Sequence, residues 1–301
     1  MNYKGFDENL KCKEFQYEIG KKYEMGGLID ICIRGFHACE APLEVLQYYP
    51  PTTSRFCEVE QSGTVVKSSH CTEIDSSEIK IVKEISVSEL IDAHIKYAKS
   101  HVKIARSGDN GVSSAPMRGA SFAGWKGISS SGHCGVSSSG DYGVSSAGWY
   151  GASSAGDYGV SSAGRRGISS SRAGGVSSAG DDGVSSAGWM GVSSSGWRGI
   201  SSVGDGGVSS SGDCGTSFAG DNGVSASRGS VAVGENGCAL VRGNGVKARG
   251  GVGSILVICV ENEDNFDIKE WKAVVVDGEV IKANTWYTVE NGKLIEVGEE
   301  C

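Results

Sequence analysis

Two consecutive octads, Gly156-Asp-Tyr-Gly-Val-Ser-Ser-Ala163 and Gly164-Arg-Arg-Gly-Ile-Ser-Ser-Ser171, show the pattern that decides the fold. The second Gly of the octad recurs at every eighth position from Gly111 to Gly223, fifteen times without a gap. A Ser two positions later keeps the same period from Ser113 to Ser225. Between them stands Val, Ile, Ala or Thr. The middle of the chain is therefore a long array of one short unit.

Each octad predicts one short strand and one corner. Val-Ser-Ser-Ala is an extended piece that suits β-branched residues, and Gly-x-x-Gly offers the positive φ values that a tight corner needs. Eight residues bury nothing alone, but stacked rungs pair backbone to backbone at about 4.8 Å. A flexible Gly/Ser linker needs neither a strict period nor an apolar residue at a fixed place. We therefore expect a β-solenoid over residues 105–258.

The corner residues bear on how many octads form one coil. Every third octad brings like residues together, such as Asp157 and Asp205, or Trp125 and Trp149. Every second octad separates the residue types less well, although it stacks Asp141 on Asp157. The pattern favours a triangular coil of three octads, with about six coils in a rod of roughly 30 Å. Alternation along the strand leaves open whether the Val face or the Ser and Ala face points inward.

The flanks of the array are not repetitive. In residues 1–104, Ser86 and Glu89 form a capping box at the start of an amphipathic segment. We expect an α+β domain whose capping helix, residues 86–100, covers the first rung of the solenoid. Residues 259–301 alternate in polarity, and Asp277-Gly278 and Asn291-Gly292 are hairpin signals. They predict a small β-hairpin cap at the C-terminal end.

Composition excludes several classes of protein. Gly supplies 47 of the 301 residues without recurring at every third position, and Pro supplies only 4, which excludes collagen. The longest apolar run, residues 255–260, is too short to span a bilayer. The net charge is −8 and no segment is strongly basic, so the chain offers no electrostatic basis for binding nucleic acid.

The cysteines and the start of the chain bear on location. The ten cysteines include no C-x-x-C pair, and the first residues have neither a basic region nor an apolar region typical of an export signal. We therefore expect reduced thiols, no metal site, no cofactor and a cytoplasmic protein.

Several segments resemble a family of phage and prophage proteins whose N-terminal domain has no known function. The resemblance rests on Tyr3-Lys-Gly-Phe-Asp7, on Gly35-Phe-His-Ala-Cys-Glu40, on the Gly/Ser/Ala array and on Trp286-Tyr-Thr288. It covers the whole layout of the chain. It implies a viral or mobile-element origin and a bacterial host, and it implies no activity.

Residues 1–60 also show a weaker resemblance to the ADP-ribosyltransferase fold. That family uses an aromatic-basic-Gly block, a Gly-aromatic block and a later Glu to hold a dinucleotide, and Lys4 stands where it has Arg or His. The resemblance implies a nucleotide site with a basic group, aromatic rings and a carboxylate. The residues at the corresponding positions are Tyr3, Lys4, Phe36, His37, Tyr49, Glu58 and Glu60, with Phe36 and His37 in place of the family's usual Ser or Tyr.

Four tryptophans occupy corner positions that are expected to face water: Trp125, Trp149, Trp189 and Trp197. Exposed aromatic residues often form contact surfaces, and the alternative is that they stack on one another along the rod. We expect a non-enzymatic binding or scaffold protein that acts on a host protein or sequesters a small nucleotide, which fits a role against host defence. The alternatives are an ADP-ribosyltransferase-like enzyme in the N-terminal domain and a structural component of a virion or filament. The flanking domains offer surfaces for self-association.

Overall fold

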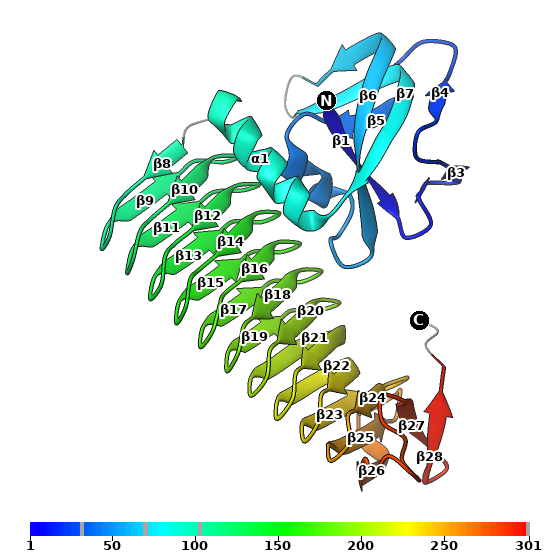
Figure 1. Ribbon diagram of the computed structural model, residues 1–301. Helices are drawn as coiled ribbons and strands as arrows, with labels where there is room; N and C mark the ends of the chain where they lie inside the picture. The colour runs from blue at the N-terminus through cyan, green and yellow to red at the C-terminus, as the bar shows by residue number, and fades with distance from the viewer. Residues whose placement is uncertain (31–32, 69–71, 102–103, 299–301) are drawn as a thin grey trace.

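The computed structural model describes residues 1–30, 33–68, 72–101 and 104–298. It has a sheet-rich N-terminal domain, a long parallel β-solenoid and a small C-terminal set of strands (Figure 1). The predicted fold class is confirmed. None of the described helices has the length and apolar character that a membrane crossing requires. The seven described cysteines are free thiols, as expected, and Cys32, Cys71 and Cys301 lie outside the described residues.

The solenoid is a flat coil of two parallel sheets, with one octad of each turn in each sheet. The first sheet contains β9 (Val112–Ala115), β11 (Ile128–Ser131), β13 (Val144–Ala147), β15 (Val160–Ala163), β17 (Val176–Ala179) and β19 (Val192–Ser195). The second contains β8 (Ile104–Arg106), β10 (Ala120–Phe122), β12 (Val136–Ser138), β14 (Ala152–Ser154), β16 (Ile168–Ser170), β18 (Val184–Ala187) and β20 (Ile200–Val203). The last turns are formed by β21 (Val208–Ala219), β22 (Val224–Val233), β23 (Cys238–Gly243), β24 (Lys247–Gly250) and β25 (Ile255–Glu261).

The strand register corrects the prediction of three octads per coil. Ile128 pairs with Val112 on one side and with Val144 on the other, so like positions recur every 16 residues rather than every 24. The rod has about ten turns. It is therefore about 48 Å long at the usual strand spacing, and longer than the roughly 30 Å expected.

The interior explains why two octads close a coil. Ser113 and Ala115 are buried while Val112 is 71% exposed, so the Ser and Ala face points inward. From Ser121 to Ser225, each serine of this series donates from its Oγ to the Oγ of the serine eight residues earlier, on the opposite sheet, at 2.8–3.0 Å. Side chains this small let two sheets meet, whereas they would leave the wider centre of a triangular coil unfilled.

The two glycines of a corner are needed because a side chain would collide there, and not because they adopt a positive φ. In Gly-x-x-Gly the second x takes the left-handed conformation, as at Lys126, Tyr142 and Met190, with φ of 51°, 57° and 52°. A Cβ on Gly188 would lie 2.8 Å from the backbone carbon of Arg172 in the previous coil. The prediction that glycine supplies the positive φ is therefore wrong for these two glycines, which are required because close stacking of the coils excludes a side chain.

Aspartates at the first x position connect successive coils. Asp141 Oδ1 accepts a hydrogen bond from the backbone N–H of Asp157, 16 residues later, at 2.9 Å. Asp109 and Asp181 accept in the same way from the N–H groups of Trp125 and Trp197, also at 2.9 Å. These carboxylates therefore satisfy backbone donors of the next corner.

The N-terminal domain is a closed ring of antiparallel strands. β1 (Asn2–Asp7) pairs with β5 (Phe36–Cys39) and with β6 (Ser54–Lys67), and β7 (Glu73–Ile85) pairs with both β5 and β6. β4 (Lys22–Glu24) extends the sheet beside β7, and β2 (Lys11–Cys12) pairs with β3 (Phe15–Gln16). Large side chains fill the ring, among them Phe6, Phe36, Val59, Ile79 and Ile81.

Two helical segments join this domain to the second sheet of the rod. They are the 3-10 helix η1 (Pro42–Gln47) and α1 (Val87–His101). We expected the helix to cover the first rung, but it packs on the outer face of the sheet and contacts β12 (Figure 1). The shared core includes Leu43, Leu46, Leu90, Ala98, Ala120, Val136 and Ala152.

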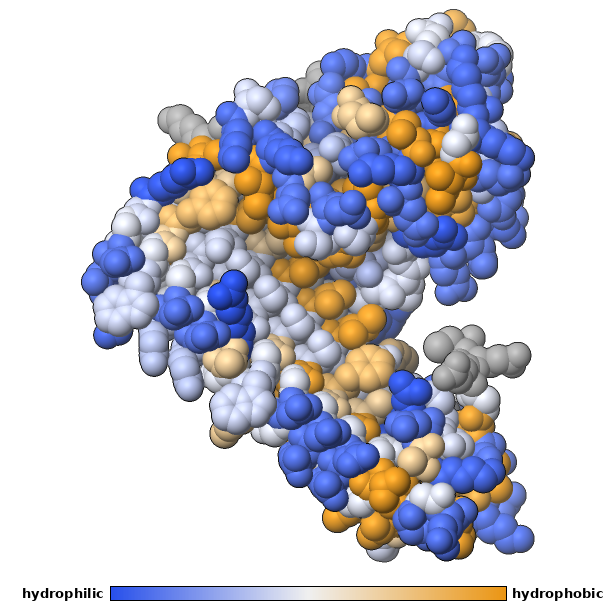
Figure 2. All heavy atoms as spheres, viewed as in Figure 1, coloured by the Kyte–Doolittle hydropathy of each residue, from blue (hydrophilic) through white to orange (hydrophobic). Residues whose placement is uncertain are grey.

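The C-terminal end is a small β cap. β26 (Ile268–Val275) pairs antiparallel with β25, and β27 (Trp286–Glu290) forms a hairpin with β28 (Lys293–Val297) through Asn291-Gly292, as predicted. Asp277-Gly278 forms a turn without a hairpin, because Asp277 Oδ1 accepts from the N–H groups of Glu279, Val280 and Ile281 at 2.9 Å. Figure 2 shows apolar side chains along the second sheet, on the concave side between the N-terminal domain and the cap.

Candidate functional site

The N-terminal domain contains a cavity of about 570 Å³. Residues of β1, β2, β5, η1 and β7 line it. Four of the seven residues expected from the sequence meet there: Tyr3, Lys4, His37 and Tyr49. A second cavity of about 550 Å³ has Lys4, Cys12, Lys13 and His37 in common with the first. The two cavities therefore adjoin along a wall that carries the basic side chains.

Lys4 is held on this wall from inside the ring of strands. Alternation along β1 places it on the same face as Phe6, and it is 4% exposed. Its ammonium donates to the backbone oxygen of His37 at 3.0 Å and lies 5.3 Å from the centroid of the Phe6 ring. Cys12 Sγ lies 3.5 Å from it. An ammonium kept at a largely desolvated wall attracts an anionic group more strongly than one in water.

Tyr49 packs directly on β1, where Gly5 makes room for its ring. A Cβ at Gly5 would collide with the ring of Tyr49. The Tyr49 hydroxyl donates to Cys12 Sγ at 3.1 Å. Burial, and next the hydrogen bond to Cys12, raise the pKa of Tyr49. Burial, with a smaller contribution from Glu58, raises the pKa of Tyr3. Both phenols therefore keep their protons at neutral pH. The Tyr49 hydroxyl uses its proton in the bond to Cys12, and the Tyr3 hydroxyl can donate to a ligand.

The carboxylates expected from the sequence lie outside the two cavities. Glu58 is the cross-strand neighbour of Tyr3, and its carboxylate lies 3.7 Å from the Lys83 ammonium. Glu60 is exposed farther along β6. Phe36 is buried in the core of the ring and lines the second cavity. The carboxylate that lines the larger cavity is Glu73.

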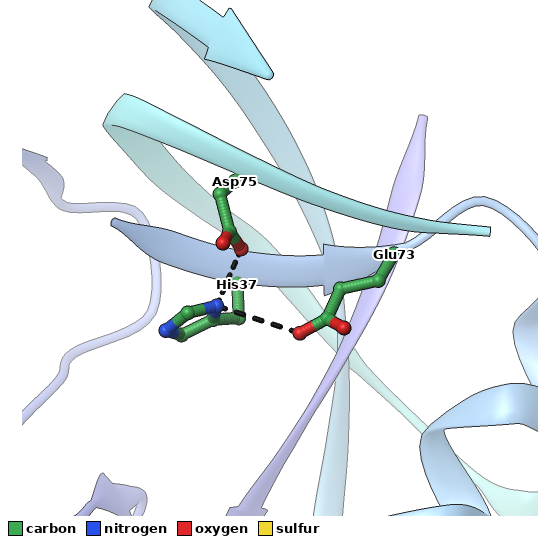
Figure 3. A group of neighbouring side chains, drawn as sticks. All are labelled: His37, Glu73 and Asp75. Carbon is green, nitrogen blue, oxygen red and sulfur yellow. Dashed lines mark ion pairs between the residues drawn. The ribbon is translucent and has the colours of Figure 1, made fainter. Parts of the chain in front are cut away.

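His37, Glu73 and Asp75 form a compact cluster at this wall (Figure 3). His37 Nδ1 lies 3.5 Å from Glu73 Oε1 and contacts Asp75 Oδ1. Figure 3 shows this nitrogen turned toward both carboxylates and the other ring nitrogen turned away. The Asp75 side chain is fully buried, that of Glu73 is nearly so, and that of His37 is a quarter exposed.

Of these three residues, the sequence predicts His37 as a site residue but neither Glu73 nor Asp75. The available signal was Glu73-Ile-Asp75, because residues two apart on a strand point to one face. His37 joins them only through the register of β5 and β7, which pairs His37 with Asp75 and Cys39 with Glu73. No local pattern gives that register.

The tryptophans expected as an interaction surface are exposed, at 44–58%, but they do not form one line. With 16 residues per coil, Trp125 and Trp189 lie on one edge of the rod, and Trp149 and Trp197 on the other. On the first edge Trp125 meets Tyr142, with ring centroids 6.4 Å apart. Tyr142 stacks on Tyr158 at 5.3 Å. That edge therefore carries a short ladder of exposed aromatic rings.

Residues 1–93 match the model of a family described as a domain of unknown function (DUF7666). The match agrees with the expected N-terminal domain of unknown function. No curated protein and no solved structure matches the chain. The resemblances to phage proteins and to ADP-ribosyltransferases stay predictions.

Proposed function

We propose that this chain is a non-enzymatic binding protein. Its N-terminal cavity holds a small nucleotide, and its solenoid is a rigid support for that domain. The observation that carries the proposal is the composition of the cavity wall, where Lys4 and Lys13 stand among Tyr3, Tyr48 and Tyr49. The cavity volume lies within the range of about 300–1,000 Å³ typical of small-molecule sites.

Each chemical part of a nucleotide finds a suitable group on this wall. Tyrosine rings offer faces on which a base stacks, worth about 1–3 kcal/mol per base where it has been measured. The ammonium groups of Lys4 and Lys13 attract phosphate. The Glu73 carboxylate and the His37 imidazole can bond ribose hydroxyls. Together these groups favour a ligand with one aromatic and one anionic end.

Two measurements on the purified full chain test the proposal. The protein is heat-denatured and the released small molecules are analysed by mass spectrometry, and its melting temperature is measured with NAD, ADP-ribose and cyclic nucleotides. We expect either a stoichiometric nucleotide or a rise in melting temperature, abolished by Lys4→Met and by Tyr49→Leu. Glu60→Gln, an exposed change outside both cavities, is the matched control and keeps the effect. An empty protein that no member of the panel stabilises contradicts the proposal.

A protein partner from a bacterial host is the second candidate. The aromatic ladder of Trp125, Tyr142 and Tyr158 favours it, because these rings are 44–57% exposed and are held by regular corners. The test identifies a protein that copurifies with the chain, and then measures binding between the two purified proteins. If the ladder is the contact surface, the Trp125→Ser, Tyr142→Ser double variant no longer binds this partner. The corresponding change on the other edge, Trp197→Ser, leaves it bound. Equal retention by both variants removes this candidate.

A further inference from the structure

We propose that His37, Glu73 and Asp75 form a binding site for one divalent transition-metal ion of the zinc class at the wall of the N-terminal cavity. The proposal goes beyond nucleotide binding, since it concerns the ion alone and needs no nucleotide. Its ligands come from two paired strands, and the ion would stand between their side chains.

Backbone pairing fixes the positions of the three side chains. β5 and β7 place His37 directly opposite Asp75, and Glu73 follows on the same face one step along β7. Side chains on adjacent strands of a closed ring have little freedom to separate. One donor atom from each residue lies within 4.8 Å of the other two. The cluster is therefore organised before any ion arrives, as a metal site requires.

The charges suit a dication. Two carboxylates this deeply buried are costly to keep ionised unless they are paired or coordinate a metal. A neutral imidazole that donates its Nδ1 lone pair, together with two carboxylates, balances the charge of a divalent ion. Tyr48 supports this arrangement, because its hydroxyl lies 3.3 Å from Glu73 Oε2 and orients that carboxylate from outside the cluster.

The donor set also selects the ion. One imidazole nitrogen with carboxylate oxygens suits zinc, cobalt or nickel, whereas calcium and magnesium prefer oxygen ligands alone. Three protein ligands leave at least one position open, as in catalytic rather than structural zinc sites. His37 and Glu73 line the larger cavity, so an ion can enter from it and a further ligand can reach the open position.

The test uses the full chain, freed of metal with a chelator and titrated with Zn²⁺ alone and with Co²⁺ alone. We expect one ion per chain at this site, and a Co²⁺ absorption spectrum of nitrogen and oxygen ligation without the charge-transfer band of a thiolate. His37→Gln and Asp75→Asn are expected to weaken binding at least tenfold. His101→Gln, on an exposed histidine of α1, is the matched control and leaves the affinity unchanged.

Two outcomes overturn the proposal. One is a wild-type chain that takes up no stoichiometric Zn²⁺ or Co²⁺, whatever the variants do. The other is binding with a thiolate spectrum, which assigns the ion to cysteines, or with an affinity that His37→Gln, Asp75→Asn and Glu73→Gln leave unchanged, which assigns it to a different site. Circular dichroism identifies any variant that fails to fold. In that case the Co²⁺ absorption spectrum of the wild-type chain shows whether nitrogen and oxygen atoms or thiolates bind the ion. Because no nucleotide is present, failure here is distinguishable from failure of nucleotide binding.

Discussion

At the corners of the solenoid, the glycines and the residue between them carry different constraints. Most of the glycines have no room for a Cβ, because it would meet backbone atoms of the previous coil or atoms of the same corner. The residue before the second glycine is in the left-handed region, which costs a non-glycine residue roughly 1–2 kcal/mol. Gly174 and Gly206 occupy this position at two corners, with φ of 64° and 67°. Glycine therefore stands mostly at positions where a side chain would collide with its neighbours, and at only a few positions where φ is positive.

Two substitutions in one corner, glycine to alanine and methionine to glycine, test whether these two positions have different constraints. Gly188→Ala is expected to lower the free energy of unfolding by about 1–3 kcal/mol, as an overpacked core position does. Met190→Gly in the same corner is expected to raise it by roughly 1 kcal/mol, because it removes the left-handed strain from a side chain that is 55% exposed. Urea unfolding followed by circular dichroism measures both. Equal effects of the same sign would contradict the account.

Two serines of one strand region test the interior hydrogen bonds. Ser169 accepts from Ser177 and donates to Ser161, so Ser169→Ala breaks the ladder and is expected to cost about 1–3 kcal/mol. Ser171 stands in a position usually held by Ala, and its buried hydroxyl has no hydrogen-bond partner among the described residues. Ser171→Ala is therefore expected to be neutral or stabilising. If both variants lowered the urea midpoint equally, the row of interior serine hydrogen bonds would make no specific contribution to the free energy of unfolding.

At the scale of elements, the same octad position has two environments. Val136 lies under η1 and α1 and is buried, while Val144 on the opposite sheet is 42% exposed. Val136→Ser is expected to destabilise the junction by about 1–2 kcal/mol, and Val144→Ser to change stability by less than about 0.5 kcal/mol. Limited proteolysis of the N-terminal domain, with urea unfolding, distinguishes them. Indistinguishable variants would mean that the domain is not docked on this sheet.

His94 makes the same junction sensitive to pH. Its ring is fully buried, with Nδ1 accepting from the Leu43 N–H at 3.3 Å and Nε2 lying 3.3 Å from the backbone oxygen of Arg118. Burial is the main cause that lowers the pKa of His94 from 6.5 to about 4. Between these pH values the unfolded chain binds one more proton than the folded chain. The His94 contribution is therefore fully present above pH 6.5 and falls by up to about 3 kcal/mol toward pH 4.

A His94→Gln variant isolates this contribution. The difference in unfolding free energy between wild type and variant is expected to be largest at neutral pH and to shrink as the pH falls from 6.5 toward 4. Urea unfolding of both proteins across that range measures the difference. Stability curves that run parallel at every pH would show that folding does not lower the pKa of His94.

The elements were more predictable than their packing. The octad gives strand and corner directly, because Val-Ser-Ser-Ala and Gly-x-x-Gly are local signals, and Asn291-Gly292 gives the hairpin in the same way. The number of octads per coil depends on whether serines eight residues apart meet across an interior, which no local pattern reports. Asp277-Gly278 shows a further limit, since β26 pairs with β25 rather than with a strand after the turn.

At the scale of the whole molecule, the rod holds the N-terminal domain and the C-terminal cap apart, with a concave apolar face between them (Figures 1 and 2). The sequence placed Tyr3, Lys4, His37 and Tyr49 at one site, and the cavity contains all four. It placed the carboxylate at Glu58 or Glu60, whereas Glu73 lines the cavity. That carboxylate reaches the cavity through the β5–β7 pairing, which joins segments more than thirty residues apart.

The most direct measurement of the central claim is a calorimetric titration of the full chain with ADP-ribose, which presents a base, a pyrophosphate and ribose hydroxyls. We predict one site per chain, weakened at least tenfold, or about 1.4 kcal/mol, by Lys4→Met. Glu60→Gln is predicted to bind as the wild type does. No heat of binding, or equal binding by the Lys4→Met variant, would contradict a nucleotide site at this cavity.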